Sequence, residues 1–215
     1  RYTYDQGAPN GGINPDTNQG WALPTETRTR PVTPDTLEPL EPAKITTTGY
    51  GDTTASWKLG LPTVETIHMD GTSTISYRTQ YDDAGRVTAT LQPKSNGTDA
   101  GTRRTAYYSA QTATRAECSN KPEWAGLECV TDYAGPTAAG GQNLITTRTE
   151  AYNQYLQPTK VVETANGATR VATNTYDQAT RPTLTRTATT GLTGSTPIKG
   201  TATVYNASTG LPTEQ

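Results

Sequence analysis

A short unit recurs along this chain and limits what the chain can fold into. One copy, residues 79–93 (TQYDDAGRVTATLQP), holds a tyrosine, two acids, a glycine, an arginine and then alternating valine and threonine. In this copy, and in those led by Tyr152 and Tyr176, the tyrosine stands six residues before a Val-Thr or Pro-Thr pair. The copy led by Tyr205 is one residue longer. Strand sequences that persist while their connections vary in length are typical of repeated β-hairpins.

Looser copies extend the pattern toward the start of the chain. Tyr4-Asp5 is separated by a long insertion from residues 21–27 (WALPTET), and Tyr50 by a shorter one from residues 60–66 (GLPTVET). Residues 103–110 (RRTAYYSA) and 128–134 (ECVTDYA) fit a degenerate hairpin with a long loop. A single hairpin is marginal in water, whereas stacked hairpins bury their faces against neighbours. We therefore expect an all-β fold over residues 1–215, in which antiparallel hairpins form one continuous curved sheet with open edges at its two ends.

The residue types in the repeat suit a tight hairpin turn. The Asp or Asn after each tyrosine can accept hydrogen bonds from backbone N–H groups two residues on, and glycine supplies positive φ where the turn requires it. Proline fits the first position of the returning strand, where no ladder donor is needed. The tyrosine ring can pack on the next hairpin while its hydroxyl reaches water or a carbonyl. The repeat-defining residues are Tyr81, Asp82, Gly85, Arg86, Tyr152, Tyr176, Asp177, Tyr205 and Gly210.

Composition agrees with an ordered, strand-rich chain that has a thin core. The apolar fraction is only 31% and phenylalanine is absent, but the net charge is −2 and the chain has 12 tyrosines and 3 tryptophans. Tyrosine and threonine favour a pleated, half-buried surface. No long apolar run predicts a membrane span, and no cluster of cations predicts nucleic-acid binding. The sequence opens inside a tyrosine-rich unit (RYTYD) without a visible signal peptide, so we expect a segment of a longer protein.

Residues 81–87 (YDDAGRV) resemble the YD (RHS) repeat of bacterial polymorphic toxins, insecticidal toxin complexes and teneurins. The later copies match less closely, since Asn replaces Asp in two of them and the Gly-Arg pair is incomplete in all three. The resemblance spans residues 2–213 and implies hairpins that spiral into a hollow β-shell around another polypeptide, often a toxic C-terminal region. The conserved segment that closes such a shell in the family is missing, so the resemblance assigns no self-cleavage to this chain.

The insertion at residues 118–129 (CSNKPEWAGLEC) resembles one in YD proteins of the secreted actinobacterial type. In that setting Cys118 and Cys129 are expected to form a disulfide that closes the loop and contributes about 2–3 kcal/mol. A redox pair and half a zinc site are the alternatives, although redox pairs usually have Cys-x-x-Cys spacing and a structural zinc needs about four ligands. Trp124 is expected to pack down over the sheet, with a ligand contact as the alternative.

Two further patterns have both a chemical and a structural interpretation. His68 could act as a base with Glu65 or Asp70, but its surroundings (VETIHMD) alternate as a strand does. Asp16 and Asn18 have the alternate spacing of calcium ligands, and an ordinary Asx turn explains that spacing as well.

Two more segments have both a functional and a structural interpretation. Asp82 and Asp83 could form an acid pair, but adjacent strand residues point to opposite faces, so turn capping is the better interpretation. The proline-rich residues 30–44 fit a linker, a polyproline ligand or an extended strip over the sheet, and we favour the strip or a loop.

These observations predict a structural, non-catalytic segment of a secreted or cell-surface protein. Its expected partners are other YD repeats of the same chain and an enclosed polypeptide such as a toxin, with no cofactor and no metal. The alternative is an extracellular carbohydrate- or cell-surface-binding module, motivated by Trp21, Trp57 and Trp124. An exposed tryptophan patch would favour that module, and buried tryptophans would remove its motive. An enzyme would need a cleft with two or more convergent acids.

Overall fold

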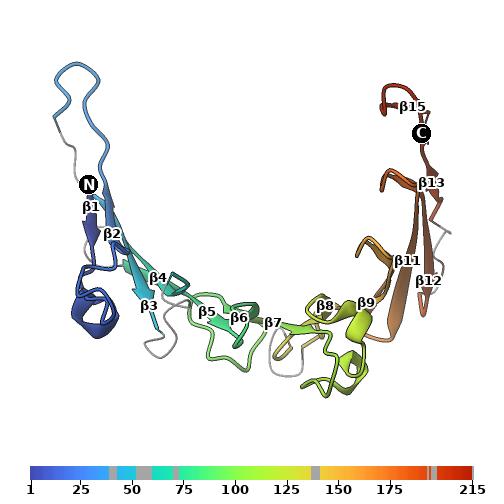
Figure 1. Cartoon of the computed structure of the whole chain (residues 1–215), viewed down its shortest axis with the longest axis horizontal. Helices are drawn as coiled ribbons and strands as arrows, with labels where there is room; N and C mark the ends of the chain where they lie inside the picture. The colour runs from blue at the N-terminus through green and yellow to red at the C-terminus, as the bar shows by residue number, and fades with distance from the viewer. Residues whose placement is uncertain are drawn as a thin grey trace. The chain divides into compact units, whose positions relative to one another are not determined.

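The computed structural model describes residues 1–38, 43–51, 60–69, 73–136, 141–192, 194 and 198–214. Over these residues the chain is all-β, each strand pairs antiparallel with a chain neighbour, and the only helical segments are single 3₁₀ turns. The predicted fold of repeated antiparallel hairpins is therefore confirmed (Figure 1). The chain divides into two compact units, Arg1–Gly97 and Thr98–Gln215. Both units are built from the same kind of hairpin. The expectation that residues 1–215 form one continuous repeat segment stays a prediction.

Among its described residues the first unit has six strands, and their order in the sheet follows the chain. They are β1 (Tyr2–Tyr4), β2 (Pro24–Thr29), β3 (Lys44–Tyr50), β4 (Pro62–Met69), β5 (Ser73–Tyr81) and β6 (Val87–Leu91). Two of the returning strands begin at a proline, as the sequence predicts. The register is regular until the last residue before each turn, where β3–β4 and β5–β6 shift by one residue. These shifts fall at the tyrosines that end β3 and β5.

The second unit repeats the arrangement, again in chain order. Its strands are β7 (Thr102–Tyr107), β8 (Glu128–Tyr133), β9 (Thr146–Tyr152), β10 (Pro158–Ala165), β11 (Ala168–Tyr176), β12 (Pro182–Thr190) and β13 (Thr201–Ala202), followed by the separate pair β14 (Val204–Tyr205) and β15 (Pro212–Glu214). The predicted hairpin of residues 103–110 and 128–134 is present as β7 and β8, with Ala106 opposite Val130. Residues 150–156 form the end of β9 and the turn that follows it.

Each unit has a thin core. Among the described residues only seven hydrophobic side chains are buried: Ala8, Ala89, Leu91, Tyr108, Cys118, Cys129 and Val130. Four of these form one cluster, made by Tyr108, Cys118, Cys129 and Val130 in the second unit. Most strand residues are half-buried, as the low apolar fraction predicts. The hairpins are therefore joined mainly by the strand ladder and by polar contacts.

The long connections are partly described. In the proline-rich segment, residues 33–38 form a turn in which the Thr33 N–H donates to the Glu38 carbonyl at 3.0 Å, so this part is a loop between β2 and β3. Residues 39–42 lie outside the described residues, as do residues 70–72, which include Asp70. Within the ranges given above, no helix has the length and apolarity needed to cross a bilayer.

Candidate functional site: the tyrosine-led turns and the disulfide-closed loop

Each hairpin has an outgoing strand, which ends in a tyrosine, and a returning strand after the turn. Five of these tyrosines donate their hydroxyl to the carbonyl of the first residue in the preceding returning strand, a bond we call the hairpin lock. The pairs are Tyr50 to Pro24 (3.1 Å), Tyr81 to Pro62 (2.9 Å), Tyr152 to Glu128 (2.7 Å), Tyr176 to Pro158 (2.9 Å) and Tyr205 to Pro182 (3.0 Å). The lock requires a tyrosine as the donor. It can form with any residue on the acceptor side, because the acceptor is a main-chain carbonyl.

The acid after the tyrosine organises the turn. Asp82 Oδ1 accepts the N–H groups of Ala84 and Arg86, both at 2.9 Å, and Oδ2 accepts the Arg86 Nε–H at 2.8 Å. Asp177 holds Arg181 in the same way, with Arg181 Nε 2.8 Å from Oδ2. The Arg181 guanidinium also lies 4.4 Å from the centre of the Tyr205 ring, so the turn contacts the next hairpin. The turn-capping interpretation of Asp82 is therefore confirmed.

The arginine bonds lower the pKa of both turn acids. For Asp82, burial works to raise the pKa, but the side-chain and backbone hydrogen bonds from Arg86 and its charge outweigh burial and leave the pKa below its usual range. For Asp177, the hydrogen bonds from the side chain and backbone of Arg181 lower the pKa. Both carboxylates are therefore charged structural groups at neutral pH.

A neutral version of this turn occurs at Asn153. Its Oδ1 accepts the N–H groups of Tyr155 at 2.9 Å and Gln157 at 3.0 Å, and its Nδ2 donates to Gln157 Oε1 at 3.0 Å. Gln157 then replaces the arginine and donates to the Thr180 carbonyl of the neighbouring turn at 2.7 Å. The turn geometry therefore requires the acceptor oxygen and not the negative charge.

The turn requires positive φ at the residue that the sequence pattern assigns to glycine. Gly85 and Gly210 have φ of 76° and 71°, as expected. Leu156 and Thr180 occupy the same position with φ of 62° and 65°. The left-handed region is unfavourable for both residue types. Glycine is thus favoured but not required, and the only sign in the sequence is that Leu156 and Thr180 stand where other copies of the repeat have glycine.

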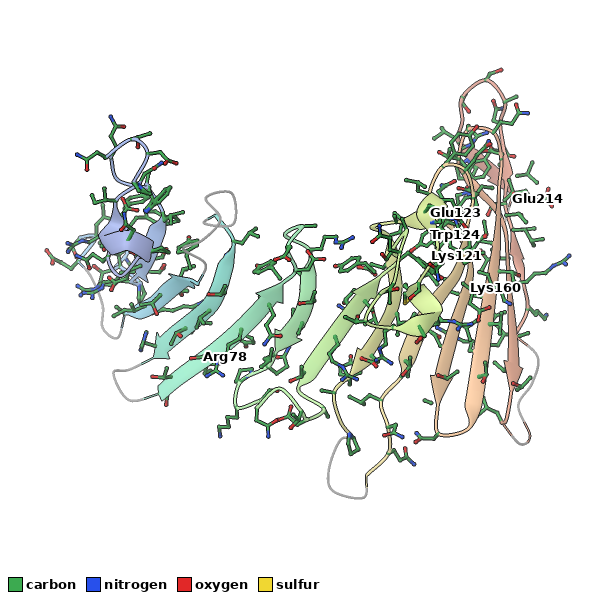
Figure 2. The ribbon with its side chains drawn as sticks, turned by 60° about the horizontal axis from the view of Figure 1, so that its bottom comes forward. Arg78, Lys121, Glu123, Trp124, Lys160 and Glu214 are labelled. Carbon is green, nitrogen blue, oxygen red and sulfur yellow. A yellow bond between two sulfur atoms is a disulfide. The ribbon has the colours of Figure 1, made fainter. Side chains whose placement is uncertain are left out.

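The predicted disulfide between Cys118 and Cys129 is present, and the two Cα atoms lie 5.8 Å apart. The zinc interpretation thereby loses its thiolate ligands, and the redox-pair interpretation is disfavoured because Cys118 and Cys129 are inaccessible to a reductant. Both sulfurs are buried in the cluster with Tyr108 and Val130. A single 3₁₀ turn, Ala116–Cys118, ends at the first cysteine, and a second, Pro122–Trp124, lies in the loop between the two cysteines. Figure 2 shows Lys121, Glu123 and Trp124 together on this loop.

Three aromatic rings hold the closed loop against the sheet. Tyr108 is 4% exposed and donates its hydroxyl to the Thr149 carbonyl at 2.6 Å. The Trp124 ring lies edge-on, 5.2 Å from Tyr108 and 5.9 Å from Tyr152 between ring centres. Burial raises the pKa of both Tyr108 and Tyr152. Trp124 therefore packs down as expected, and Tyr152 combines this packing with its hairpin lock.

A buried carboxylate ties the loop to β7. Asp132 is 8% exposed and accepts two hydrogen bonds from Arg104, from Nε and Nη2, each at 2.9 Å. Arg115, just before the first cysteine, forms a second ion pair with the same carboxylate. Sequence reasoning missed this cluster because its members are 17 and 28 residues apart and belong to no local motif.

Strand alternation separates the groups that suggested acid–base chemistry. Glu65 faces Tyr77 and His68 faces Thr74 in the register of β4 with β5, so Glu65 and His68 lie on opposite faces of β4. His68 Nε2 instead lies 3.5 Å from the Thr47 hydroxyl. The Glu65 partner proposed for a base at His68 is therefore excluded, and Asp70 falls outside the described residues.

The calcium pattern falls in a turn. The Asp16 N–H donates to Asn14 Oδ1 at 2.9 Å, and the Asn18 N–H donates to the Asn14 carbonyl at 2.8 Å. In the ranges that the structure describes, no three His, Cys, Asp or Glu side chains gather as a metal site would require. Asn14 is therefore the residue that organises this turn.

Each described tryptophan is half-buried within its own unit. Trp21 is half-buried and donates its indole N–H to the Pro9 carbonyl at 3.1 Å, while Trp124 packs as above. Trp57 lies outside the described residues. No protein-family model matches the chain, and no curated protein matches it significantly. What the molecule does must therefore be argued from its geometry, which favours holding hairpins side by side.

Proposed function

We propose that this chain is a structural wall segment, in which tyrosine-locked hairpins form part of a shell that encloses or presents another polypeptide in a secreted protein. The observation that carries the proposal is the hairpin lock, which recurs five times with donor–acceptor distances between 2.7 and 3.1 Å. A bond repeated between successive hairpins supports an extended wall. A catalytic centre instead concentrates its chemistry in one place.

The arrangement of acids supports the same proposal. Asp82 and Asp177 each hold the arginine of their own turn, and Asp132 holds Arg104 of the facing strand β7, so the charge of all three acids is used for structure. The resemblance of residues 81–87 to YD repeats suggests a steric role for the wall, which would keep an enclosed polypeptide away from solvent and proteases. The disulfide supports an oxidising, extracellular location.

The alternative of a carbohydrate- or cell-surface-binding module has less support. Its motive was the set of three tryptophans, and the two described ones are half-buried with their rings or indole N–H engaged. We therefore propose the structural role first and treat glycan binding as an outcome that the test below can reveal.

The test is protease protection in the longer protein to which we assign this segment. Three locks are removed together by Tyr81→Phe, Tyr176→Phe and Tyr205→Phe, which leave the rings in place. We expect an enclosed polypeptide to resist protease in the natural protein and to be cut at least severalfold faster in the triple variant. The matched control is Tyr155→Phe, since Tyr155 lies on a turn and is 51% exposed.

Two results would contradict the proposal. One is a natural protein in which no polypeptide is protected beyond the segment itself. The other is specific retention of the segment on a glycan surface, with the same retention in the control variant Tyr155→Phe. Circular dichroism of each variant checks that the sheet is still folded.

A further inference from the structure

The turn between β10 and β11 holds a second hairpin through one side chain. Asn166 and Gly167 are its two central residues, with φ of 48° and 81°, and Ala165 faces Ala168 on either side. Positive φ at both positions defines the two-residue turn that an Asn-Gly pair favours. The Asn143 N–H donates to Asn166 Oδ1 at 3.2 Å, and Asn166 Nδ2 donates to the Asn143 carbonyl at 3.4 Å. These two bonds, the asparagine clip, fasten the connection between β8 and β9 to the turn.

A nucleophile for the clip amide lies in the next residue of the chain. Asn166 and Gly167 are both exposed, and the Gly167 N–H donates to no acceptor among the residues that the structure describes. A Cβ added at Gly167 would meet no atom within 4 Å, so nothing crowds this nitrogen. A bond from the nitrogen to Asn166 Cγ closes a succinimide ring. The Asn166 amide is therefore accessible to attack by its own main chain.

This deamidation needs water and no other reagent. The Gly167 nitrogen attacks Asn166 Cγ and loses its proton, the Cγ–Nδ2 bond breaks, and Nδ2 takes up that proton and leaves as ammonia. Water then opens the succinimide at either carbonyl and gives aspartate or isoaspartate. During the attack negative charge develops on Asn166 Oδ1, the oxygen to which the Asn143 N–H already donates. A donor in this place stabilises the oxyanion, as it does in acyl-transfer sites.

We propose that the Asn166–Gly167 turn deamidates by itself in the folded protein, with the Asn143 N–H as the oxyanion donor, and that the product opens the asparagine clip. A carboxylate has no N–H to donate to the Asn143 carbonyl, and two facing acceptors repel each other. Isoaspartate also adds a methylene to the main chain of a turn whose length fixes the register of β10 with β11. This modification site does not depend on enclosure of another polypeptide.

Asn10–Gly11 is a matched internal control. Its φ angles are 54° and 64°, both residues are exposed, and a Cβ added at Gly11 would again meet no atom within 4 Å. Asn10 Nδ2 donates to the Ile13 carbonyl at 2.7 Å, whereas no N–H of the described residues donates to Asn10 Oδ1. The two Asn-Gly pairs therefore share conformation and access, and they differ in the donor at Oδ1.

Peptide mass spectrometry during incubation in a mildly alkaline buffer compares the two pairs within one molecule. We expect Asn166 to convert about threefold faster than Asn10 in the folded protein, a small part of what such a donor contributes where water is excluded. In urea, where the Asn143 donor is lost, the two rates should become similar. A folded-state rate at Asn166 that is equal to or below the rate at Asn10 would overturn the proposal.

Two variants at residue 143 test the donor itself. Asn143→Pro removes the N–H, and Asn143→Ala is its matched control, because both clip bonds use the main chain of Asn143. We expect Asn143→Pro to slow the conversion of Asn166 about threefold, to the rate of Asn10, and Asn143→Ala to leave it unchanged. Faster conversion in Asn143→Pro would show that the clip protects the amide, which also overturns the proposal. Circular dichroism and the Asn10 rate check that each variant is folded.

Hydrogen exchange measures the opening of the clip. The deamidated form carries one more negative charge, so ion exchange separates it from the natural form. We expect its Asn143 amide to exchange about fivefold faster, while the Val130 amide in the buried cluster exchanges as before. Equal exchange of the Asn143 amide in the two forms would show that the product keeps the connection fastened, and opening of the clip would then be wrong.

Discussion

The disulfide-closed loop and the tyrosine-led turns stabilise the same sheet by different means. Around the loop, Tyr108, Cys118, Cys129 and Val130 are buried together, and a covalent bond joins two of them. At the turns, the Asp82 and Asn153 side chains are still partly exposed and stabilise by accepting backbone N–H groups. The comparison teaches that a chain with few apolar residues can concentrate its core in one place and rely on repeated polar bonds elsewhere.

The difference should appear in how much stability one change removes. A core group is supported by many neighbours at once, whereas each turn bond acts in its own hairpin. We therefore expect changes around the loop to lower the free energy of unfolding of the second unit strongly, and changes at one turn to act weakly and locally.

The largest effect is expected from removing the disulfide. Cys118→Ala with Cys129→Ala should cost about 3 kcal/mol, because the bond closes a short loop and constrains the unfolded chain. Urea unfolding of the second unit, followed by hydrogen exchange of the Val130 and Cys129 amides, measures this change. Reduction of the natural protein should give the same loss. A cost below about 1 kcal/mol would show that the aromatic rings alone hold the loop.

The next largest effect is expected from removing a hydrogen bond between a tyrosine hydroxyl and a backbone carbonyl, and it should differ between a buried and a partly solvated site. Tyr108→Phe should cost about 2 kcal/mol, since it leaves the Thr149 carbonyl without the hydroxyl inside a buried cluster. Tyr176→Phe removes the same kind of bond from a partly solvated lock and should cost about 1 kcal/mol or less. Equal costs in urea unfolding would contradict the distinction between the two regions.

At the turns, removal of the capping side chain should cost about 1 kcal/mol. Asp82→Ala takes away the acceptor of the Ala84 and Arg86 N–H groups, and such capping bonds have about this value at helix ends. Asn153→Ala is the matched neutral case and should cost a similar amount. Local amide exchange at the two turns measures both. A much larger cost for Asp82→Ala would mean that the charge, and not the acceptor oxygen, holds the turn.

Backbone strain at the turns gives a smaller effect of opposite sign. Thr180→Gly and Leu156→Gly should stabilise their turns by about 0.5 kcal/mol, because glycine adopts positive φ without the steric cost of a side chain. Gly85→Ala is the converse control and should destabilise. Thermal unfolding of the three variants tests this, and a loss of stability in Thr180→Gly would show that its side chain matters more than its φ.

The smallest expected effect is on the pH dependence. The pKa of Asp82 is lower when folded than when unfolded, so its contribution is present above the unfolded pKa of about 3.9 and is lost as the pH falls through the folded pKa. The natural protein should therefore exceed Asp82→Asn in stability at pH 6 and converge with it in acid. A difference that grows on acidification would contradict the role of Arg86.

The parts of this structure that could be predicted from the sequence are those set by local residue chemistry, namely the turns and the starts of the returning strands. The turn at Asp82 followed from an acid two residues before backbone donors and from Gly85 at the positive-φ position. The position of proline at the start of β4, β10, β12 and β15 was predictable, because the first residue of a returning strand needs no N–H for the ladder. Leu156 and Thr180 stand at the glycine position of the aligned repeat, but the sequence alone did not show that their backbone keeps positive φ there.

Contacts between distant residues were the other part that the sequence could not supply. The tyrosine hydroxyl was expected to reach water or a carbonyl, and only the strand register identified which carbonyl. Asp132 with Arg104 and Arg115, and Tyr108 with Thr149, depend on pairings across long loops. The two cysteines and the resemblance to secreted YD proteins predicted the loop closure but gave no sign that Asp132 pairs with Arg115 just before the loop.

The main-chain acceptor of the hairpin lock has a consequence for how such chains diversify. A hydroxyl that recognises a peptide carbonyl makes no demand on the side chain it meets. A gene can therefore lose, gain or exchange whole tyrosine-led hairpins while the junctions on either side remain compatible. Recombination would then change the length of the sheet in steps of one hairpin, and point mutations could vary the residue that supplies the carbonyl without loss of the lock.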